Sequence, residues 1–346
     1  MTDQDFMLSA LLLAQKGSKY AAPNPMVGAV IVHNGKVIGQ GYHQKCGEAH
    51  AEVNAVESVV DKSVLSESTI YVTLEPCAHT GKTPPCADLI VKHKFKRCVV
   101  ACVDTFSKVA GKGIARLKEA GIEVEVGVLE QACRNLNKRF FTFHEKGRPY
   151  IVLKWAETQD GFVDRLPEER EKGINWITQP ETKKLVHQWR SEEQAILVGW
   201  KTVVNDNPSL TVREVEGKNP HRYIIDPNFK SKGNYEVYTD KNPTTVFVNE
   251  SCELSRIDNV EFVRLPNFEI ETVLAEVKKK NHISLFVEGG KHTLEQFIVS
   301  GFWDEARILT GNVSFNKGLK APAVEGERTV LKTDLKQDKV FIIHNQ

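Results

Sequence analysis

The segment Thr69-Ile-Tyr-Val-Thr-Leu-Glu75 is a β-branched and apolar run that ends at Pro76-Cys77. Such a run, closed by a proline, predicts a strand. Upstream, Asn34-Gly35 separates two apolar runs and is the strongest two-residue hairpin signal. Strands and helices alternate around this segment, which predicts an α/β sheet with helices on its faces. The predicted elements are helices at 4–18, 49–60, 86–95, 112–120 and 129–140, and strands at 29–42 (a hairpin), 69–75, 97–103 and 122–126.

The alternation stops at a polar tract, His144-Glu-Lys-Gly-Arg-Pro149, and then restarts. We therefore predict two α/β domains, residues 1–146 and 147–346, as expected for a chain of 346 residues. The predicted elements of the second domain are strands at 150–156, 195–199, 222–226, 244–248, 283–287 and 305–309, and helices at 180–191, 270–280 and 291–300.

Composition excludes several classes of protein. Lys and Arg number 46 and Asp and Glu 45, and a net charge of +1 argues against a protein that coats nucleic acid. There is no apolar run of about 18 residues, so we expect no membrane span. The acidic N-terminus is unlike a signal peptide, and a cytoplasmic location is expected. The seven cysteines are odd in number, which argues against a disulfide framework, and six of them precede residue 140.

His50-Ala51-Glu52, Cys77 and Cys86 form a pattern typical of a metal site. One imidazole and two thiolates suit a tetrahedral Zn²⁺ whose fourth position stays open, as in catalytic sites. His50 and Glu52 diverge in mid-helix, so they can approach one metal only at the start of a helix. The remaining cysteines are predicted to be packing residues.

This pattern resembles the nucleobase deaminase signature, H-x-E followed by P-C-x-x-C, except that eight residues separate the two cysteines here. The string Thr73-Leu-Glu-Pro-Cys-Ala-His-Thr-Gly-Lys-Thr-Pro-Pro-Cys86, with Pro23-Asn-Pro-Met-Val-Gly-Ala29, resembles the deaminase domain of the bifunctional riboflavin-biosynthesis family. The resemblance implies a cytidine-deaminase-like three-layer α/β/α fold, and zinc-dependent hydrolytic deamination of a pyrimidine ribose phosphate with Glu52 moving the protons. It also implies substrate contacts at Asn24, His43, His79 and Lys82.

The second half lacks a Gly-x-Gly-x-x-Gly fingerprint, but Val287-Glu-Gly-Gly290 joins a predicted strand to a helix whose N-terminus favours anions. Together with Asp206-Asn-Pro-Ser-Leu-Thr-Val-Arg213, it resembles the reductase domain of the same family. That resemblance implies a dihydrofolate-reductase-like fold that uses NADPH, with Asp206 assisting the reduction. The implied cofactor residues are Ala156, Trp176, Thr202, Asp206, Gly290, Lys291, His292 and Thr293, and the implied substrate residues are Arg190, Leu210, Arg213 and Glu288.

The chain departs from the family pattern at three places, one of which is Glu157-Thr-Gln159 in place of Met-Ser-Leu before Asp160-Gly161. Asp104-Thr-Phe-Ser107 replaces Asp-Pro-Asn-Pro, and Ile174 replaces a serine before Trp176. Two alternatives stay open at this point: a nucleoside or tRNA deaminase with an unrelated second domain, and a zinc-stabilised binding protein without catalysis. The family resemblance predicts small-molecule phosphates as partners and a homo-oligomer, either a dimer or a tetramer. The near-zero net charge and the Gly81-Lys82-Thr83 insertion argue against binding of nucleic acid.

Overall fold

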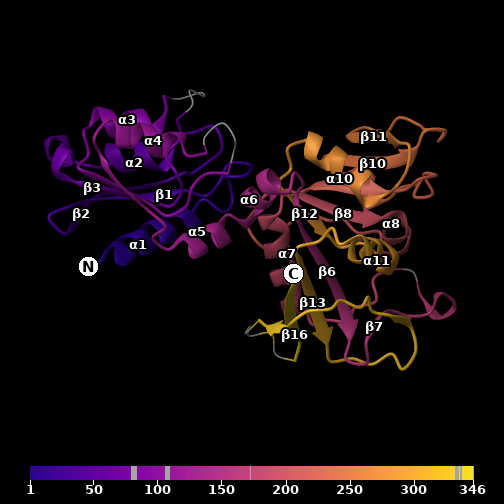
Figure 1. Cartoon of the computed structure of the whole chain (residues 1–346). Coiled ribbons are helices and arrows are strands. Elements are labelled where there is room, and N and C mark those ends of the chain that lie inside the picture. The colour runs from indigo at the N-terminus through magenta and orange to yellow at the C-terminus, as the bar shows by residue number, and fades with distance from the viewer. Residues whose placement is uncertain (79–83, 106–109, 172, 332–334, 336, 346) are drawn as a thin grey trace. The chain divides into compact units, whose positions relative to one another are not determined.

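The computed structural model describes residues 1–78, 84–105, 110–171, 173–331, 335 and 337–345. The chain divides into two compact units, Met1–Gly147 and Arg148–Gln346 (Figure 1). Each unit has a hydrophobic core of its own, built from strands and the helices that cover them.

The first unit is built on a five-stranded sheet of order β2-β1-β3-β4-β5. Strand β1 is antiparallel to β2 and β3, whereas β3, β4 and β5 are parallel. The predicted hairpin is confirmed, since Asn34 and Gly35 both take the positive φ of a tight turn. The strands are β1 (Gly28–His33), β2 (Lys36–Tyr42), β3 (Thr69–Val72), β4 (Arg97–Val100) and β5 (Glu123–Val126).

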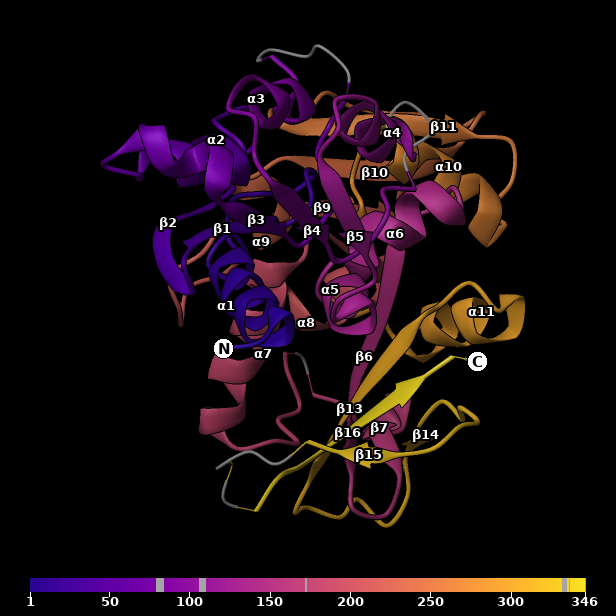
Figure 2. The ribbon, with the colours of Figure 1, turned by 60° about the vertical axis from the view of Figure 1, so that its left-hand side comes forward.

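Helices cover both faces of this sheet and confirm the predicted three layers (Figures 1 and 2). Helix α1 (Asp3–Gln15) contacts β1, β2 and β3, and α5 (Glu130–Leu136) lies against α1. On the other face α2 (Ala51–Glu57) packs on β1 and β2, followed by α3 (Cys86–Lys92) and α4 (Lys112–Glu119). A 3-10 helix, η1 (Lys62–Glu67), precedes β3.

The helix predicted at 129–140 is interrupted at Asn137 and is followed by α6 (Lys138–Glu145). The side chain of Asn137 binds the backbone of Met26, accepting from its N–H and donating to its C=O, both at 2.8 Å. This long-range contact fixes the segment that carries Asn24, and it explains the break.

The second unit contains a nine-stranded sheet of order β11-β10-β9-β8-β12-β6-β13-β16-β15. It is parallel except for β16 and β15 at one edge. Strands β7 and β14 form a separate antiparallel pair. The strands are β6 (Tyr150–Thr158), β7 (Phe162–Asp164), β8 (Ala195–Gly199), β9 (His221–Ile225), β10 (Thr244–Asn249), β11 (Val260–Leu265), β12 (Ser284–Val287), β13 (Glu305–Gly311), β14 (Leu319–Lys320), β15 (Thr329–Val330) and β16 (Lys339–His344).

Two apolar clusters, one on each face of this sheet, form the core of the second unit. The helices are α7 (Pro180–Glu192), α8 (Trp200–Asp206), α9 (Glu236–Thr239), α10 (Ile270–Lys279), α11 (Lys291–Ser300) and the 3-10 helix η2 (Pro167–Glu169). Helix α8 starts directly after β8, and α11 starts four residues after β12 ends, so both open at the carboxyl edge of the sheet. Ligands of open parallel sheets bind at this edge.

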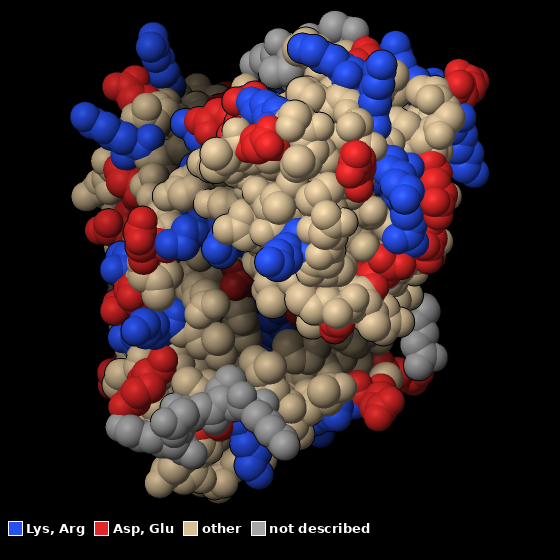
Figure 3. Space-filling model, turned by 90° about the vertical axis from the view of Figure 1, so that its left-hand side faces the viewer, with Lys and Arg blue, Asp and Glu red and all other residues tan. Residues whose placement is uncertain are grey.

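Basic and acidic side chains are intermixed on the face of the molecule shown in Figure 3. This arrangement agrees with the net charge of +1. No helix of the described residues is long and apolar enough to cross a membrane.

Candidate active sites

His50, Cys77 and Cys86 come together at one edge of the first sheet. His50 is the N-cap residue of α2, Cys77 follows β3, and Cys86 is the first residue of α3. Their ligand atoms all lie within 4.8 Å of one another. The structure therefore brings together two helix starts and one strand end, as the sequence predicts.

The spacing of these three atoms fits a zinc ion. Nδ1 of His50 lies 3.6 Å from Sγ of Cys77 and 3.3 Å from Sγ of Cys86. A tetrahedral Zn²⁺ with ordinary bond lengths separates its nitrogen and sulfur ligands by about 3.6 Å. The backbone N–H of Cys86 donates to Sγ of Cys77 at 3.3 Å, and hydrogen bonds from Cys86 and His50 lower the pKa of Cys77. A thiolate is the form that binds metal.

Glu52 lies beside the three ligands without belonging to them. It is in the first turn of α2, is 3% exposed, and forms a hydrogen bond with Cys86. Burial, and secondarily the neighbouring Cys77, raise the pKa of Glu52 to about 7. A carboxyl group poised near neutral pH can both accept and return a proton.

Asn24 and His43 meet close to the metal ligands. The amide nitrogen of Asn24 lies 3.1 Å from Nε2 of His43, whose Nδ1 lies 3.1 Å from the carbonyl oxygen of Ala49. The His43 ring packs edge-on to His50, with ring centroids 5.4 Å apart, and burial lowers the pKa of His43. His43 therefore orients the Asn24 side chain. The other two predicted contacts, His79 and Lys82, lie outside the described residues.

A second group of predicted residues gathers at the carboxyl edge of the other sheet. The backbone N–H of Gly290, the N-cap of α11, donates to Oγ1 of Thr202 at 3.0 Å. A Cβ on Gly289 would lie 2.9 Å from Cβ of Thr293, and one on Gly199 would lie 2.7 Å from its Oγ1. The ends of β8 and β12 and the starts of α8 and α11 thus form one cradle, in which close approach requires glycine.

The other predicted cofactor residues differ in their surroundings. Lys291 forms an ion pair with Glu295, 3.2 Å away, and His292 is exposed. Ala156, on β6, is partly buried against the core. Trp176 is 52% exposed, with the amine of Lys183 3.7 Å above its ring centroid.

Two of the predicted substrate residues, Arg190 and Glu288, bind each other. The Arg190 guanidinium donates to both carboxylate oxygens of Glu288, at 2.6 and 2.9 Å, and Lys154 lies 3.4 Å from the same carboxylate. Burial opposes ionisation, but Arg190 and Lys154 prevail and lower the pKa of Glu288 to about 2. This pair ties α7 to the end of β12.

Arg213 is exposed and donates to Oγ of Ser209 at 2.7 Å, so its guanidinium faces solvent. Leu210 has a positive φ of 53° and a side chain that is only 2% exposed. Its side chain packs in the core, and any contact with substrate would use its backbone.

Asp206 ends α8 and pairs with Arg170 from the loop that follows β7. Arg170 also binds Asp164 at 2.6 Å and the carbonyl oxygen of Gly173 at 3.0 Å. Burial raises the pKa of Asp206 to about 6, against the opposing charge of Arg170.

Sequence analysis missed three residues that shape these sites: Asn137, Lys154 and Arg170. Asn137 contacts a segment 111 residues away, and Lys154 a carboxylate 134 residues away. No local pattern marks such partners. Lys154 lies two residues before Ala156, and a basic residue so close to an assigned position is the one signal that could have found it.

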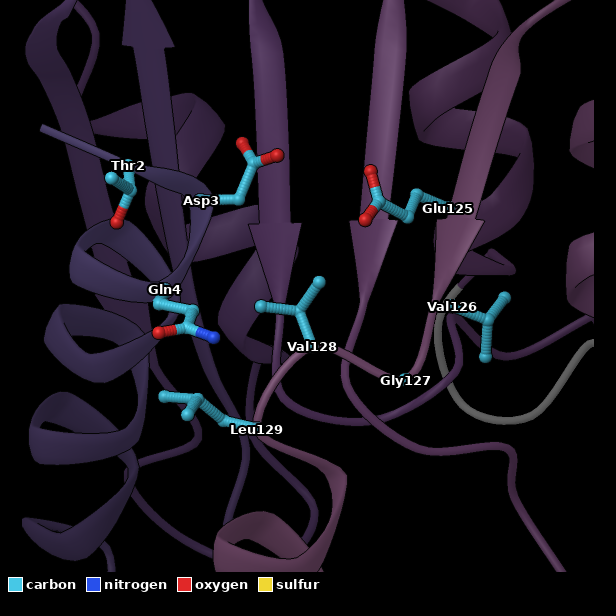
Figure 4. Close-up of a pocket in the computed structure, with 8 residues that line it drawn as sticks. All are labelled: Thr2, Asp3, Gln4, Glu125, Val126, Gly127, Val128 and Leu129. Atoms are coloured by element: carbon cyan, nitrogen blue, oxygen red, sulfur yellow. The ribbon is translucent and has the colours of Figure 1, made fainter.

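A separate hollow in the first unit is lined by residues 2–4 and 125–129 (Figure 4). Its two carboxylates, Asp3 and Glu125, both pair with Arg97, and Tyr71 donates to Asp3 at 2.6 Å. These bonds brace the start of α1 against β4 and β5, and they account for the acidic lining structurally.

Comparison with known proteins agrees with this geometry. Residues 1–102 match the cytidine and deoxycytidylate deaminase zinc-binding region, and residues 149–342 match the RibD C-terminal domain. The riboflavin biosynthesis protein RibD of Aquifex aeolicus is 42% identical over 322 residues, which cover 92% of this chain and 89% of that protein. The corresponding protein of Escherichia coli is 33% identical, with 88% and 86% covered.

Solved structures show the same likeness over the full length. The diaminohydroxyphosphoribosylaminopyrimidine deaminase/5-amino-6-(5-phosphoribosylamino)uracil reductase of Thermotoga maritima is 33% identical, with a TM-score of 0.88 and 99% of both chains covered. RibD of Acinetobacter baumannii gives the same TM-score at 30% identity, with 99% of both chains covered. Fold and site thus define a bifunctional enzyme, a zinc-dependent deaminase joined to a reductase. The chain belongs to the RibD family of riboflavin biosynthesis proteins.

Proposed function

We propose that the first unit deaminates 2,5-diamino-6-(ribosylamino)-4(3H)-pyrimidinone 5′-phosphate and that the second reduces the ribosyl group of the product with NADPH. The product would be 5-amino-6-(ribitylamino)uracil 5′-phosphate. The observation that carries the proposal is the cluster of His50, Cys77 and Cys86 with Glu52 buried beside it. Among the described residues only these three ligands gather, which leaves the fourth position for a water, as a purely structural zinc site does not.

Zinc, when bound, would supply a Lewis acid that lowers the pKa of the attacking water. Glu52 would accept a proton from that water and return it to the amino group that leaves as ammonia. Burial suits this role, because it holds the pKa of Glu52 near 7 while a bound cation favours the ionised form. Asn24, oriented by His43, would hold the pyrimidine.

The cradle of Thr202, Gly290 and Thr293 supports a dinucleotide diphosphate at the start of α11, with Lys291 and His292 at its rim. The helix is ten residues long and its first N–H groups attract anions. Ala156 and Trp176 would border the nicotinamide half. NADPH would supply the hydride, and the protein would supply orientation and charge.

For the substrate of the reductase, Arg213 supports binding of the ribose phosphate, because its guanidinium is exposed. The backbone of Leu210 would lie beside it. Arg190 and Glu288 would form the floor of the site as an ion pair rather than bind phosphate. Asp206, held by Arg170, would assist the reduction.

We also propose that the chain forms a homo-oligomer, either a dimer or a tetramer. Leu8 and Leu12 support this, since they lie one turn apart on α1 and are 47% and 54% exposed. Light scattering of the purified protein tests it, and a monomer at micromolar concentration would contradict it.

The deaminase is tested by ammonia release from the diaminopyrimidine phosphate. Glu52→Gln should lower the rate by ~10²–10⁴-fold, the usual contribution of a positioned acid–base group, while bound zinc stays at the wild-type level. Zinc is measured by atomic absorption on the same sample.

The same variant also tests the reductase. Supplied with the deaminated intermediate, Glu52→Gln should oxidise NADPH at the wild-type rate. Full ammonia release by the zinc-loaded variant would overturn the role of Glu52, and failure of the wild-type chain to oxidise NADPH would overturn the second activity.

A further inference from the structure

Glu75 is a buried carboxylate that neither the metal nor the proton transfer uses. It is 4% exposed, and among the described residues four backbone N–H groups donate to it. Oε2 accepts from Asp104 at 3.2 Å and from Gly111 at 2.9 Å, and Oε1 accepts from Gly113 at 2.8 Å and from Ile114 at 3.2 Å. A buried charge is costly unless its lone pairs are satisfied, and an ionised carboxylate has room for four donors.

Two of these donors, Asp104 and Gly111, lie in the connection between β4 and α4, and the other two, Gly113 and Ile114, lie in the first turn of α4. Strands β3 and β4 are parallel neighbours, so the segment after β4 lies beside the segment after β3 at the same edge of the sheet. The backbone N–H of Glu75 itself donates to the carbonyl oxygen of Cys102 at 2.9 Å. Glu75 is therefore bonded to this connection through both its backbone and its side chain.

The metal ligand Cys77 is two residues from Glu75, and the start of α4 lies directly on the residue between them. A Cβ on Gly113 would lie 1.9 Å from the carbonyl oxygen of Pro76. Only glycine permits that approach. Only Pro76 therefore separates Glu75, with its hydrogen bonds to Asp104 and α4, from the metal ligand Cys77.

We propose that Glu75 is a positioning residue of the deaminase: its carboxylate holds Asp104 and the first turn of α4 in register with Cys77, so that these flanks shape the substrate side of the metal site. The proposal rests on the proposed deaminase function. It concerns Asp104, Thr105 and Gly111–Ile114, which are described residues.

Substitution of Glu75 by glutamine tests these hydrogen bonds most directly. The glutamine amide has the same shape, but one oxygen becomes an NH₂ group, which would face two N–H donors and accept from neither. Either the N–H groups of Asp104 and Gly111 or those of Gly113 and Ile114 would then lose their hydrogen-bond acceptor. Metal ligation would be retained, because Glu75 donates nothing to the metal.

Steady-state deamination and reduction are measured on full-length, zinc-loaded Glu75→Gln. We expect the KM for deamination to rise by at least ~10-fold, since small misplacements of a binding wall carry effects of this order. Zinc should stay at one per chain, and the KM for the deaminated intermediate in the NADPH reaction should stay at the wild-type value. Glu57→Gln, an exposed carboxylate at the end of α2, is the matched control and should change neither KM.

Two results would overturn the proposal. A lower melting temperature with wild-type KM and kcat for deamination would make Glu75 a stabilising residue only. Loss of zinc together with activity would mean that it acts through Cys77 rather than through the connection. If the wild-type chain released no ammonia, the proposed deaminase function itself would be rejected, and this outcome is distinguished from the other two because it does not depend on the variant.

If Glu75→Gln does not fold, Gly111→Ala tests the same contact. Gly111 has a φ of 76° and open space around its Cα, so alanine strains the backbone at one anchor without a clash. The same rise in KM, smaller in size, is expected. An unchanged KM in a variant whose unfolding midpoint has dropped would contradict the proposal.

Discussion

Two arginines that the sequence assigns to the same task differ in their surroundings. Arg190 forms a buried bidentate pair with Glu288, whereas Arg213 is exposed. Arg190→Leu would leave Glu288 buried with Lys154 alone. We expect the free energy of unfolding to fall by about 3–5 kcal/mol, the usual cost of breaking a buried pair. Urea denaturation followed by tryptophan fluorescence measures it.

Arg213→Leu is the matched comparison. Because its side chain is exposed, the free energy of unfolding should change by no more than about 0.5 kcal/mol, while the KM of the reductase substrate rises. Equal losses of stability in the two variants would contradict the separation of their roles.

The pair of Arg170 and Asp206 predicts a pH dependence. Burial raises the pKa of Asp206 to about 6, and Arg170 opposes that rise. If the ionised carboxylate is the active form, reductase kcat/KM falls as the pH drops below about 6. Arg170→Gln removes the stabilising charge, so the midpoint of this fall should move to higher pH. A pH profile with the midpoint unmoved or lowered would show that Arg170 does not control Asp206.

At the scale of single residues, the sequence could predict which side chains bind a metal, but not which side chains pair with each other in the folded chain. His50, Cys77 and Cys86 are recognisable because their side chains are typical metal ligands and because two of them, His50 and Cys86, stand at predicted helix starts. The pairing of Arg190 with Glu288 joins residues 98 apart, and only the folded sheet brings them together. The prediction that both contact substrate therefore stays untested, although the ion pair limits what Arg190 can offer.

Helix α2 packs on β2 through glycine, and this packing sets the height of Glu52 above the sheet. A Cβ on Gly41 would lie 2.4 Å from the backbone nitrogen of Ala55 and 2.6 Å from the carbonyl oxygen of Ala51. Gly41→Ala should push α2 away, lower the free energy of unfolding by about 1–3 kcal/mol and reduce zinc content. Chemical denaturation and metal analysis measure the two effects.

Gly35→Ala provides the control on the same hairpin. Gly35 has a φ of 73°, and a Cβ added there would have no neighbour within 4 Å, so alanine should cost about 1 kcal/mol of backbone strain. Zinc content should stay at the wild-type level. Equal zinc loss in both variants would mean that hairpin stability, not the position of α2, controls the metal site.

The sequence predicted some helices and strands with their exact bounds and missed others. Strand β8 and helix α11 have the bounds that the sequence predicts, because β8 is a short apolar run and α11 begins after Gly290 and ends before Gly301. Strands β11 and β16 were not predicted. Both contain Val, Phe or Ile residues, which favour strands, and both pair in the sheet, β11 with β10 and β16 with β13. Helix α8 was missed because it follows β8 without a loop.

For the molecule as a whole, acid should weaken the second unit. Burial lowers the pKa of His221 and His282 to about 4, below the value near 6.5 of an unfolded histidine. Their neutral forms thus stabilise the fold above pH 6.5, and this contribution is lost as the pH falls from 6.5 toward 4. All five tryptophans lie in the second unit, at positions 155, 176, 189, 200 and 303, so their fluorescence follows that unit.

The urea midpoint seen by fluorescence should therefore drop between pH 7 and pH 5. His282→Gln, which keeps a polar partner for the hydroxyl of Tyr223, 3.0 Å from His282, should reduce the drop. A midpoint that does not change over this range would rule out buried neutral histidines as the cause.

The burial of the cysteines makes metal loading visible to a simple reagent. Cys46 is exposed and Cys252 and Cys77 are half-buried, whereas Cys86, Cys98, Cys102 and Cys133 are buried. A thiol-specific dye should therefore label Cys46 and Cys252 in the zinc-loaded chain, because a thiolate bound to metal is shielded from alkylation. After chelation Cys77 should join them. The number of labelled thiols per chain would then count occupied metal sites in a folded sample, without any assay of either reaction.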